Sequence, residues 1–171
     1  MATPEWVELV CPLSQKPFRA RTMGSSYYIS GIDTDLRELG SIEEVRRFSV
    51  VTSPFTGYSD YAWEFLAPDE LEPDVRQRLE SALAASQALP NRTVGDFERL
   101  ELSKRCFEAR GLDVSALAEL ALLAYYVAQD LGRRDLTPGL RDEAAGLFER
   151  ALEEEELPGR SASATPTWRA S

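Results

Sequence analysis

The chain has 171 residues, of which 43% are hydrophobic and 28% charged. This is enough to bury one core, with at most a small satellite subdomain. Its net charge of −10 excludes a general nucleic-acid binder, because affinity for the phosphate backbone depends on clustered lysine and arginine. The opening stretch MATPEWVELV carries acidic residues where a signal peptide needs an apolar run, and no window approaches the ~18 apolar residues of a membrane span. We therefore expect a globular cytoplasmic protein that does not insert into membranes.

Residues 1–66 are predicted to form a small β-rich subdomain, because short alternating or aromatic segments are separated there by proline, glycine and serine. The predicted strands are 6–10, 27–30, 48–51 and 61–65. Between the second and third strands, Ser41 and Glu44 have the spacing of a capping box and predict a short helix.

Residues 67–157 are predicted to form a helical subdomain, starting where Pro68 and Pro73 punctuate the chain. The predicted helices span 74–89, 94–110, 114–131 and 138–157. Gly111 and Asp113 indicate a tight turn between the second and third helices, typical of an antiparallel helical hairpin. Thr137 is the expected N-cap of the last helix, with Pro138 at its first helical position.

The third predicted helix is apolar on nearly all sides, which predicts a central position among the helices. Its main apolar stripe consists of Leu117, Leu120, Ala121, Ala124, Val127, Ala128 and Leu131. Tyr125 and Tyr126 are neighbours on this helix and therefore point about 100° apart. At most one can be directed fully at the core stripe, while the other faces a neighbouring helix or a binding groove.

Two short turns have the arrangement of zinc knuckles that have lost most of their ligands. The first contains Cys11 and Ser14, and the second contains Ser53 and Thr56, at the positions where a zinc ribbon carries its thiolates. Hydroxyl groups are poor zinc ligands at neutral pH, and the chain has no histidine. We therefore expect a degenerate site without metal. Both cysteines are expected to be free thiols, with Cys106 on the buried face of a helix.

The order of several motifs resembles an uncharacterised bacterial family called domain of unknown function 2225. The resemblance rests on the two turns about 40 residues apart, Gly57-Tyr58 directly after the second turn, DTDLR at 33–37, and LALLAYYVAQDLG at 120–132, and it covers about residues 7–155. Members of the family pair a CPxC and CPxCGY zinc ribbon with helices of tetratricopeptide-like (TPR-like) character, and no reaction is established for them. The resemblance implies an α+β fold in which a degenerate zinc-ribbon-like β part packs on a TPR-like helical bundle. Ser14, Ser53 and Thr56 depart from the family pattern, so the metal is not carried over.

Apolar packing is the expected replacement for the missing metal in the β-rich part. Its aromatic residues are numerous for so short a segment, and each can bury ~150–250 Å². They are Phe18, Phe48, Phe55, Tyr58, Tyr61, Trp63 and Phe65.

The residue types argue against most catalysis. Without histidine, Ser-His-Asp and Cys-His systems are excluded, and the chain has no glycine-rich nucleotide loop. Asp33 and Asp35 could hold Mg²⁺ through two carboxylates, which leaves a small metal-dependent enzyme as the alternative. The simpler interpretation is that these side chains cap a turn or pair with Arg37.

The leading hypothesis is a non-catalytic adaptor or assembly subunit that binds another protein and needs no cofactor. One candidate surface is a helical groove near Tyr125 and Tyr126. The other is the tail 158–171, which has the composition of a disordered segment, with Trp168 and Arg169 as a candidate anchor. The expected partner is another protein, either a basic one or a second copy of the chain, and the basic tail could also reach an acidic partner. An accidental tryptophan is the alternative for the tail.

Overall fold

The computed structural model of the protein describes residues 1–86 and 94–156. The strands are β1 (Glu5–Val10), β2 (Pro17–Thr22), β3 (Ile29–Ile32), β4 (Glu38–Gly40), β5 (Val50–Thr52) and β6 (Ser59–Tyr61). The α-helices are α1 (Ile42–Val45), α2 (Pro73–Leu83), α3 (Asp96–Arg110), α4 (Val114–Asp130) and α5 (Thr137–Glu156). Strands in the N-terminal part and helices mostly in the C-terminal part confirm an α+β fold.

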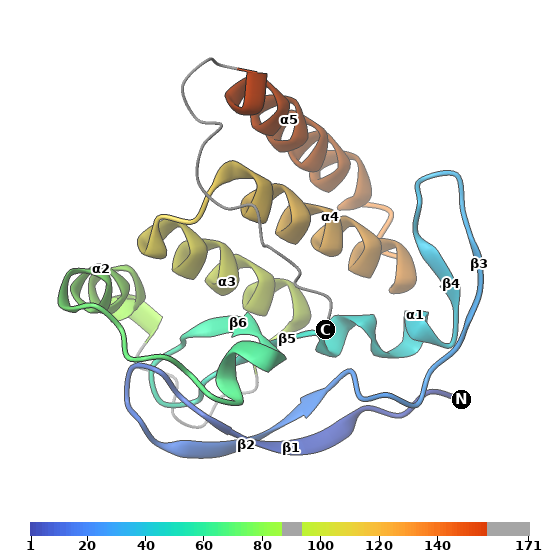
Figure 1. Ribbon diagram of the computed structural model, residues 1–171. Coiled ribbons are helices and arrows are strands. Elements are labelled where there is room, and N and C mark those ends of the chain that lie inside the picture. Colours follow the sequence, from blue (N-terminus) through green and yellow to red (C-terminus); the bar gives the residue numbers. More distant parts are fainter. Residues whose placement is uncertain (87–93, 157–171) are drawn as a thin grey trace, which may run out of the picture.

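The elements form layers (Figure 1). Each strand pairs with its neighbour in sequence, so that β1–β2, β3–β4 and β5–β6 are antiparallel hairpins. The β1–β2 hairpin lies beneath β5–β6, α3 packs on β5 and β6, and α4 and α5 follow in order. The α2 helix packs beside α3, and the β3–β4 hairpin rises next to the C-terminal end of α4.

The main apolar cluster is shared between the two predicted subdomains. Leu9 and Phe65 from the β-rich part pack with Leu79 and Leu83 of α2 and with Leu102 of α3. A second cluster joins β5 to α3 and α4. Apolar packing therefore crosses the predicted boundary near residue 66.

Two strands were not predicted from the sequence. The β2 strand, PFRART, pairs with the whole length of β1, but its proline and two exposed arginines disguise the alternation of Phe18, Ala20 and Thr22 on its inner side. The β4 strand has only three residues, too few to show a period.

Other predicted strands are displaced or wrong. The 61–65 segment is a strand only at Tyr61, the end of β6, and continues as a 3₁₀ turn over Ala62–Phe65. The Ala62 N–H donates to the Ser49 carbonyl oxygen at 3.0 Å, and the turn buries Phe65 in the core. The 48–51 prediction likewise begins in a 3₁₀ turn, Arg46–Phe48, before β5. The predicted strand 27–30 overlaps β3 only at its end.

The helix predictions agree more closely. The bounds of α3, α4 and α5 lie within two residues of the predicted ones, whereas α2 ends at Leu83 and a 3₁₀ turn over Ala84–Ser86 follows. The tight turn between α3 and α4 is confirmed: Gly111 has a left-handed φ of 71°, and the Asp113 carboxylate accepts the Ala116 N–H at 2.9 Å.

Two predicted caps are wrong: the side chains of the first bond to other groups, and the residue of the second lies inside its helix. The Ser41 hydroxyl accepts the Tyr28 N–H at 2.9 Å, and Glu44 accepts the Ala2 N–H at 2.9 Å, so they do not cap each other across α1. Thr137 is the first residue of α5, and its hydroxyl donates to the Arg134 carbonyl oxygen at 3.2 Å. Thr137 therefore lies one position inside the helix and not at the N-cap position.

Only some of the aromatic residues of the β-rich part are buried as predicted. Phe18, Tyr58 and Phe65 are buried and meet edge to face, with ring centroids 5.5–5.6 Å apart, a favourable geometry for aromatic pairs. Phe55 and Trp63 are instead 40% and 57% exposed. Among the described helices, none is both long enough and apolar enough to cross a membrane.

Candidate functional site

The first of the two turns is closed by backbone hydrogen bonds around Cys11. The Cys11 N–H donates to the Lys16 carbonyl oxygen at 3.0 Å, and the Gln15 N–H donates to the Cys11 carbonyl oxygen at 2.8 Å. Gln15 has a left-handed φ of 56°, and its side-chain amide donates to the Pro12 carbonyl oxygen at 2.8 Å. The turn therefore brings Cys11 and Ser14 to the same side of the chain.

The second turn repeats this pattern around Ser53. The Ser53 N–H donates to the Tyr58 carbonyl oxygen at 2.7 Å, and the Gly57 N–H donates to the Ser53 carbonyl oxygen at 3.0 Å. Gly57 has a φ of 78°, and a Cβ placed on it would lie 2.9 Å from the Ser86 Cβ. Glycine is required here both for the backbone conformation and for the close approach of the chain after α2.

The four side chains at the former ligand positions come together, and we call them the hydroxyl cluster: Cys11, Ser14, Ser53 and Thr56. The Cys11 Sγ lies 3.4 Å from the Thr56 Oγ1. The Cys11 thiol is buried, which disfavours its ionisation, but hydrogen bonds from the other three hydroxyls outweigh this effect and lower the pKa of Cys11. The Ser14 and Thr56 hydroxyls also accept backbone N–H groups of their own turns, at 3.4 Å and 3.2 Å.

The hydroxyl cluster does not fit a zinc ion. It offers one sulfur and three alcohol oxygens, whereas zinc is held by thiolate, imidazole and carboxylate groups. Among the described residues, no three or more histidine, cysteine, aspartate or glutamate side chains gather in a metal-binding arrangement.

A charged group lies behind the second turn. Asp60, only 1% exposed, accepts the Tyr58 hydroxyl at 3.0 Å and forms an ion pair with Arg110. Burial raises the pKa of Asp60 although Arg110 opposes the shift. Burial also raises the pKa of Cys106 to about 12, although the Ser59 N–H donates to its sulfur. Cys11 and Cys106 lie in the same apolar cluster, but the pKa of Cys11 is lowered and the pKa of Cys106 is raised.

Asp33 builds the tip of the β3–β4 hairpin. Its carboxylate accepts the N–H groups of Asp35 and Arg37 at 2.9 Å and 3.0 Å, and the Arg37 Nε at 3.0 Å. These hydrogen bonds outweigh the desolvation of Asp33 and lower its pKa. Asp33 thus caps a turn and pairs with Arg37, as the simpler interpretation of DTDLR expected.

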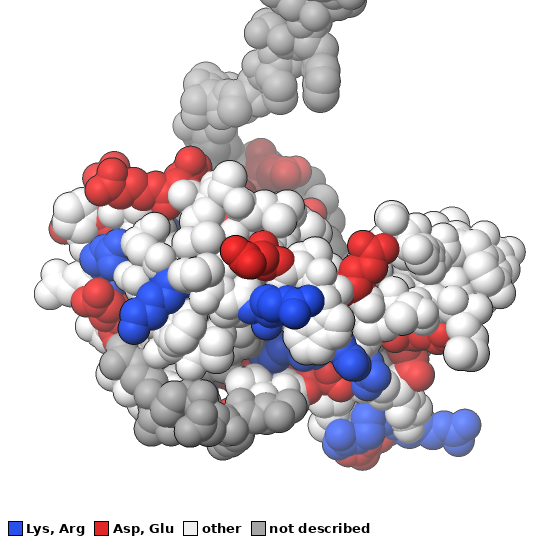
Figure 2. Space-filling view, turned by 90° about the horizontal axis from the view of Figure 1, so that it is seen from below, with Lys and Arg blue, Asp and Glu red and all other residues white. Residues whose placement is uncertain are grey.

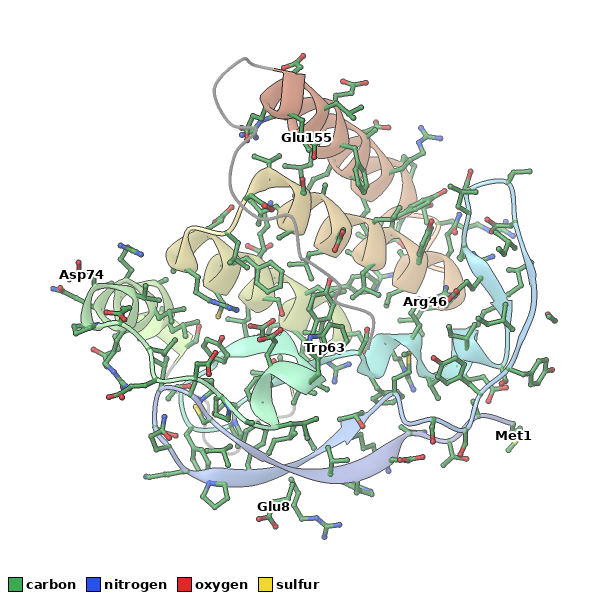
Figure 3. The ribbon with its side chains drawn as sticks, in the orientation of Figure 1. Met1, Glu8, Arg46, Trp63, Asp74 and Glu155 are labelled. Carbon is green, nitrogen blue, oxygen red and sulfur yellow. The ribbon has the colours of Figure 1, made fainter. Side chains whose placement is uncertain are left out.

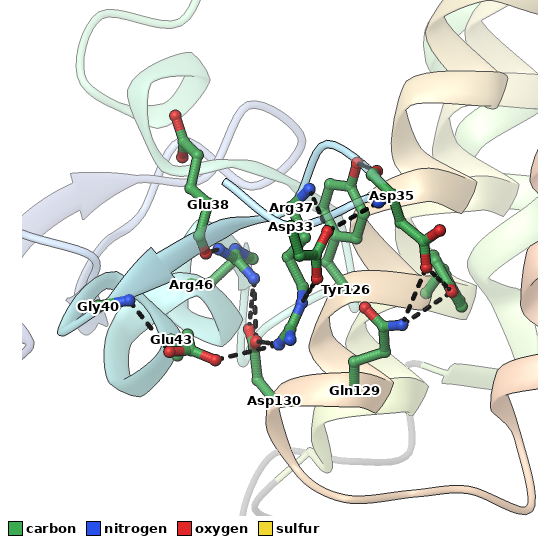
Figure 4. A network of polar contacts seen from close by, with 11 residues as sticks. Asp33, Asp35, Arg37, Glu38, Gly40, Glu43, Arg46, Tyr126, Gln129 and Asp130 are labelled. Carbon is green, nitrogen blue, oxygen red and sulfur yellow. Dashed lines mark hydrogen bonds and ion pairs between the residues drawn. The ribbon is translucent and has the colours of Figure 1, made fainter. Parts of the chain in front are cut away.

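Two arginines hold a buried carboxylate at the end of α4 (Figure 4). Arg37 and Arg46 each donate to Asp130, at 2.7 Å and 2.8 Å, and the Asp130 side chain is 3% exposed. Arg37 also pairs with Glu43 at 3.1 Å, and Arg46 donates to the Glu38 carbonyl oxygen. Arg46 lies between α1 and α4 (Figure 3). Burial raises the pKa of Asp130 against the effect of both arginines.

Both candidate tyrosines contact the same hairpin tip. The Tyr125 hydroxyl donates to the Asp35 carboxylate at 2.6 Å, and the Tyr126 hydroxyl donates to the Asp35 carbonyl oxygen at 2.6 Å. The Gln129 amide donates to the Tyr125 hydroxyl at 2.7 Å. The hydrogen bond to Asp35, together with burial, raises the pKa of Tyr125 to about 12. We call the whole set the hairpin clasp: Asp33, Asp35, Arg37, Arg46, Tyr125, Tyr126 and Asp130.

A groove of about 210 Å³ lies over α4, between α3 and α5. It is lined by Phe97, Leu100, Glu101, Lys104, Leu117, Leu120, Ala121, Ala124, Leu136, Leu140 and Glu143. The ion pair between Lys104 of α3 and Glu143 of α5 spans the two flanking helices. Tyr125 and Tyr126 do not line the groove, because they face the hairpin tip instead.

The sequence held a signal for part of this groove. Four residues of the apolar stripe of α4 line it: Leu117, Leu120, Ala121 and Ala124. Which residues of α3 and α5 join them at the groove depends on how the helices pack. Trp168 and Arg169, the candidate tail anchor, lie outside the described residues.

Basic and acidic side chains are interspersed on the face beneath β1 and β2 (Figure 2).

No protein-family model, curated protein or solved structure matches this chain.

Proposed function

We propose that the protein is a non-catalytic interaction module that binds a peptide segment of another protein in the groove over α4. The observation that carries the proposal is the partly exposed apolar lining of this groove. Phe97, Leu117, Leu136 and Leu140 are only half-buried although they surround a concave site. Covering apolar surface contributes roughly 25 cal/mol per Å², so a fitting side chain would gain affinity there.

The overall charge of the chain favours a particular kind of peptide. At the groove itself, Glu143 pairs with Lys104 and Glu101 pairs with Arg105, but the whole chain carries a net charge of −10. A long-range negative field speeds the approach of basic segments. The proposed ligand is therefore a short segment with one large apolar side chain next to arginine or lysine.

We also infer that the two turns are degenerate zinc-ribbon knuckles, and that the helices α3, α4 and α5 are TPR-like. The two turns share one backbone hydrogen-bond pattern, around Cys11 and around Ser53, which supports their assignment as knuckles. The successive antiparallel packing of α3, α4 and α5 supports their TPR-like character. Both are what the resemblance to domain of unknown function 2225 implies. Concave surfaces of stacked helical hairpins serve as peptide sites.

The geometry gives less support to the alternative of a metal-dependent enzyme. Both carboxylate oxygens of Asp33 accept hydrogen bonds within the hairpin, and one oxygen of Asp35 accepts the Tyr125 hydroxyl. A metal ion would have to displace these internal donors.

Peptide selection on the full-length chain tests the proposal. A library displaying one aromatic or aliphatic residue flanked by basic, neutral or acidic residues should yield basic apolar sequences. Leu140→Glu, in the groove, should weaken the selected peptides by about tenfold or more, the loss of ~1.4 kcal/mol expected for one anchor contact.

Leu152→Glu is the matched control. Leu152 is on the same helix, is 61% exposed and does not line the groove, so binding should stay within about twofold. Circular dichroism of both variants verifies that they are folded. Equal binding to the two variants, or selection of acidic peptides, would overturn the proposal.

A further inference from the structure

We propose that the C-terminal segment 158–171 of the same chain occupies the groove, with Trp168 as its apolar anchor. The chain would then carry its own competitor for the peptide site. This inference rests on the proposed function of the groove, and it adds a regulation of that site. Three observations carry it: the position of α5, the reach of the chain beyond α5, and the chemistry of the segment.

The helix that precedes the segment is itself a wall of the groove. Leu140 and Glu143, in the first half of α5, line the groove, and α5 ends at Glu156. The distance along the helix from Glu143 to its end is about 20 Å at 1.5 Å per residue. An extended chain covers up to ~3.3–3.6 Å per residue, so the stretch from Glu156 to Trp168 reaches about 40 Å. The tether is therefore long enough for Trp168 to return to the groove.

The composition of the segment matches the ligand that the groove favours. The sequence PGRSASATPTWRAS contains two arginines, Arg160 and Arg169, and no acidic residue. Trp168 is its one large apolar side chain, and a tryptophan can bury ~150–250 Å². Arg169, directly after it, would lie near Glu101 and Glu143, which already pair with Arg105 and Lys104, so the attraction for the basic segment comes from the net charge of −10 of the chain. Apolar anchor and basic flank thus come from adjacent residues.

Tethering makes even a weak contact effective. A short flexible linker gives an effective concentration on the order of 1 mM. A segment that binds with a Kd of about 100 μM in trans would then occupy the groove in about 90% of molecules. An external peptide would bind about tenfold more weakly than to an empty groove. The segment would set an affinity threshold for partners.

Fluorine NMR on the full-length chain labelled with 5-fluorotryptophan tests the position of Trp168. Its signal is assigned with Trp168→Phe. In the wild-type chain the Trp168 signal should lie away from that of a fully solvated tryptophan, and Leu140→Glu should move it to the solvated position. Leu152→Glu should leave it in place. The inference would be overturned if the Trp168 signal of the wild-type chain had the chemical shift of a solvated tryptophan, or if Leu140→Glu did not change that shift.

Competition provides the second measurement. A synthetic peptide of residues 158–171 should bind the full-length Trp168→Ala variant about tenfold more tightly than the wild type, because the variant's own segment no longer competes. Equal affinities would contradict the inference. A shift of the Trp168 signal that grows with protein concentration, together with a doubled mass, would show occupation by a second copy and overturn the same-chain claim.

The two proposals fail in different ways. If selected library peptides bind the groove but Trp168 stays solvated, only the self-occupation is wrong. If neither selected peptides nor the segment bind there, the proposed function is wrong as well.

Discussion

The hydroxyl cluster and the hairpin clasp both hold the β-rich part in place through polar side chains, but with different chemistry. The hydroxyl cluster joins two turns within the β-rich part, and the hairpin clasp joins the β3–β4 hairpin to α4. The hydroxyl cluster uses one thiol and three neutral hydroxyls inside two local turns. The hairpin clasp uses charged side chains from β3–β4, the 3₁₀ turn after α1, and α4.

This difference indicates which of the two sites tolerates change. A neutral hydroxyl that keeps its hydrogen bonds costs little to bury, so ligand positions can be replaced while the turn survives. A buried charge that loses its partner is left uncompensated, and that penalty is large. We therefore expect the clasp to be sensitive to single substitutions and the hydroxyl cluster to be tolerant.

The largest effect is expected for Asp130→Ala. This substitution leaves Arg46 and Arg37 facing each other without the carboxylate between them, and breaking a buried pair costs about 3–5 kcal/mol. Urea unfolding followed by circular dichroism measures the free energy of unfolding. The control, Asp135→Ala, removes an exposed ion pair with Arg133 and should change stability by less than about 0.5 kcal/mol. Similar small losses for both would show that the clasp is no more than a surface contact.

The second largest effect is expected at the hydroxyl cluster, where substitutions should create a zinc site and increase stability. Ser14→Cys, Ser53→Cys and Thr56→Cys together should create a site that binds one zinc ion per chain, because the two turns already bring these positions around Cys11. At free zinc 100-fold above the Kd, the gain is about 2.7 kcal/mol. Elemental analysis and thermal unfolding with and without chelator measure it.

The wild-type chain, purified alongside, is expected to contain no zinc. Ser14→Cys alone, with two thiols, should bind zinc far more weakly than the triple variant. A triple variant that folds but takes up no zinc would show that the four positions do not converge tetrahedrally.

The smallest effect is expected for Tyr125→Phe, which removes the hydroxyl that donates to Asp35. A hydrogen bond to a charged acceptor contributes about 1.5–3 kcal/mol, and partial exposure of the pair places this one at the low end. Because the pKa of Tyr125 is raised in the folded chain to about 12, its contribution is fully present below pH ~10, the ordinary tyrosine pKa. The contribution is lost as the pH rises from there through the folded value.

Urea unfolding at pH 8 and pH 11 therefore distinguishes the two proteins. The difference in stability between wild type and Tyr125→Phe should shrink at the higher pH. Tyr28→Phe, at an exposed position, should show no such change. A difference independent of pH would mean that Tyr125 acts through packing and not through its proton.

The sequence by itself determined the local features of this protein. The periodicity of 94–110, 114–131 and 138–157 placed three helices, since a helical period is visible within one segment. Gly111 and Asp113 specified the turn between α3 and α4. The repeated pattern at Cys11 and Ser53 could also be recognised in the sequence, because each turn is closed by residues within five positions of its start.

Only the tertiary structure decided which of these features meet. Asp35 and Tyr125 were both singled out as candidates, yet nothing in either local pattern pairs residues 90 positions apart, and the same holds for Arg46 and Asp130. The groove depends on three helices packing side by side, and the 3₁₀ turn at Ala62–Phe65 depends on burying Phe65. Such contacts arise from long-range packing and charge pairing, which a local sequence period does not encode.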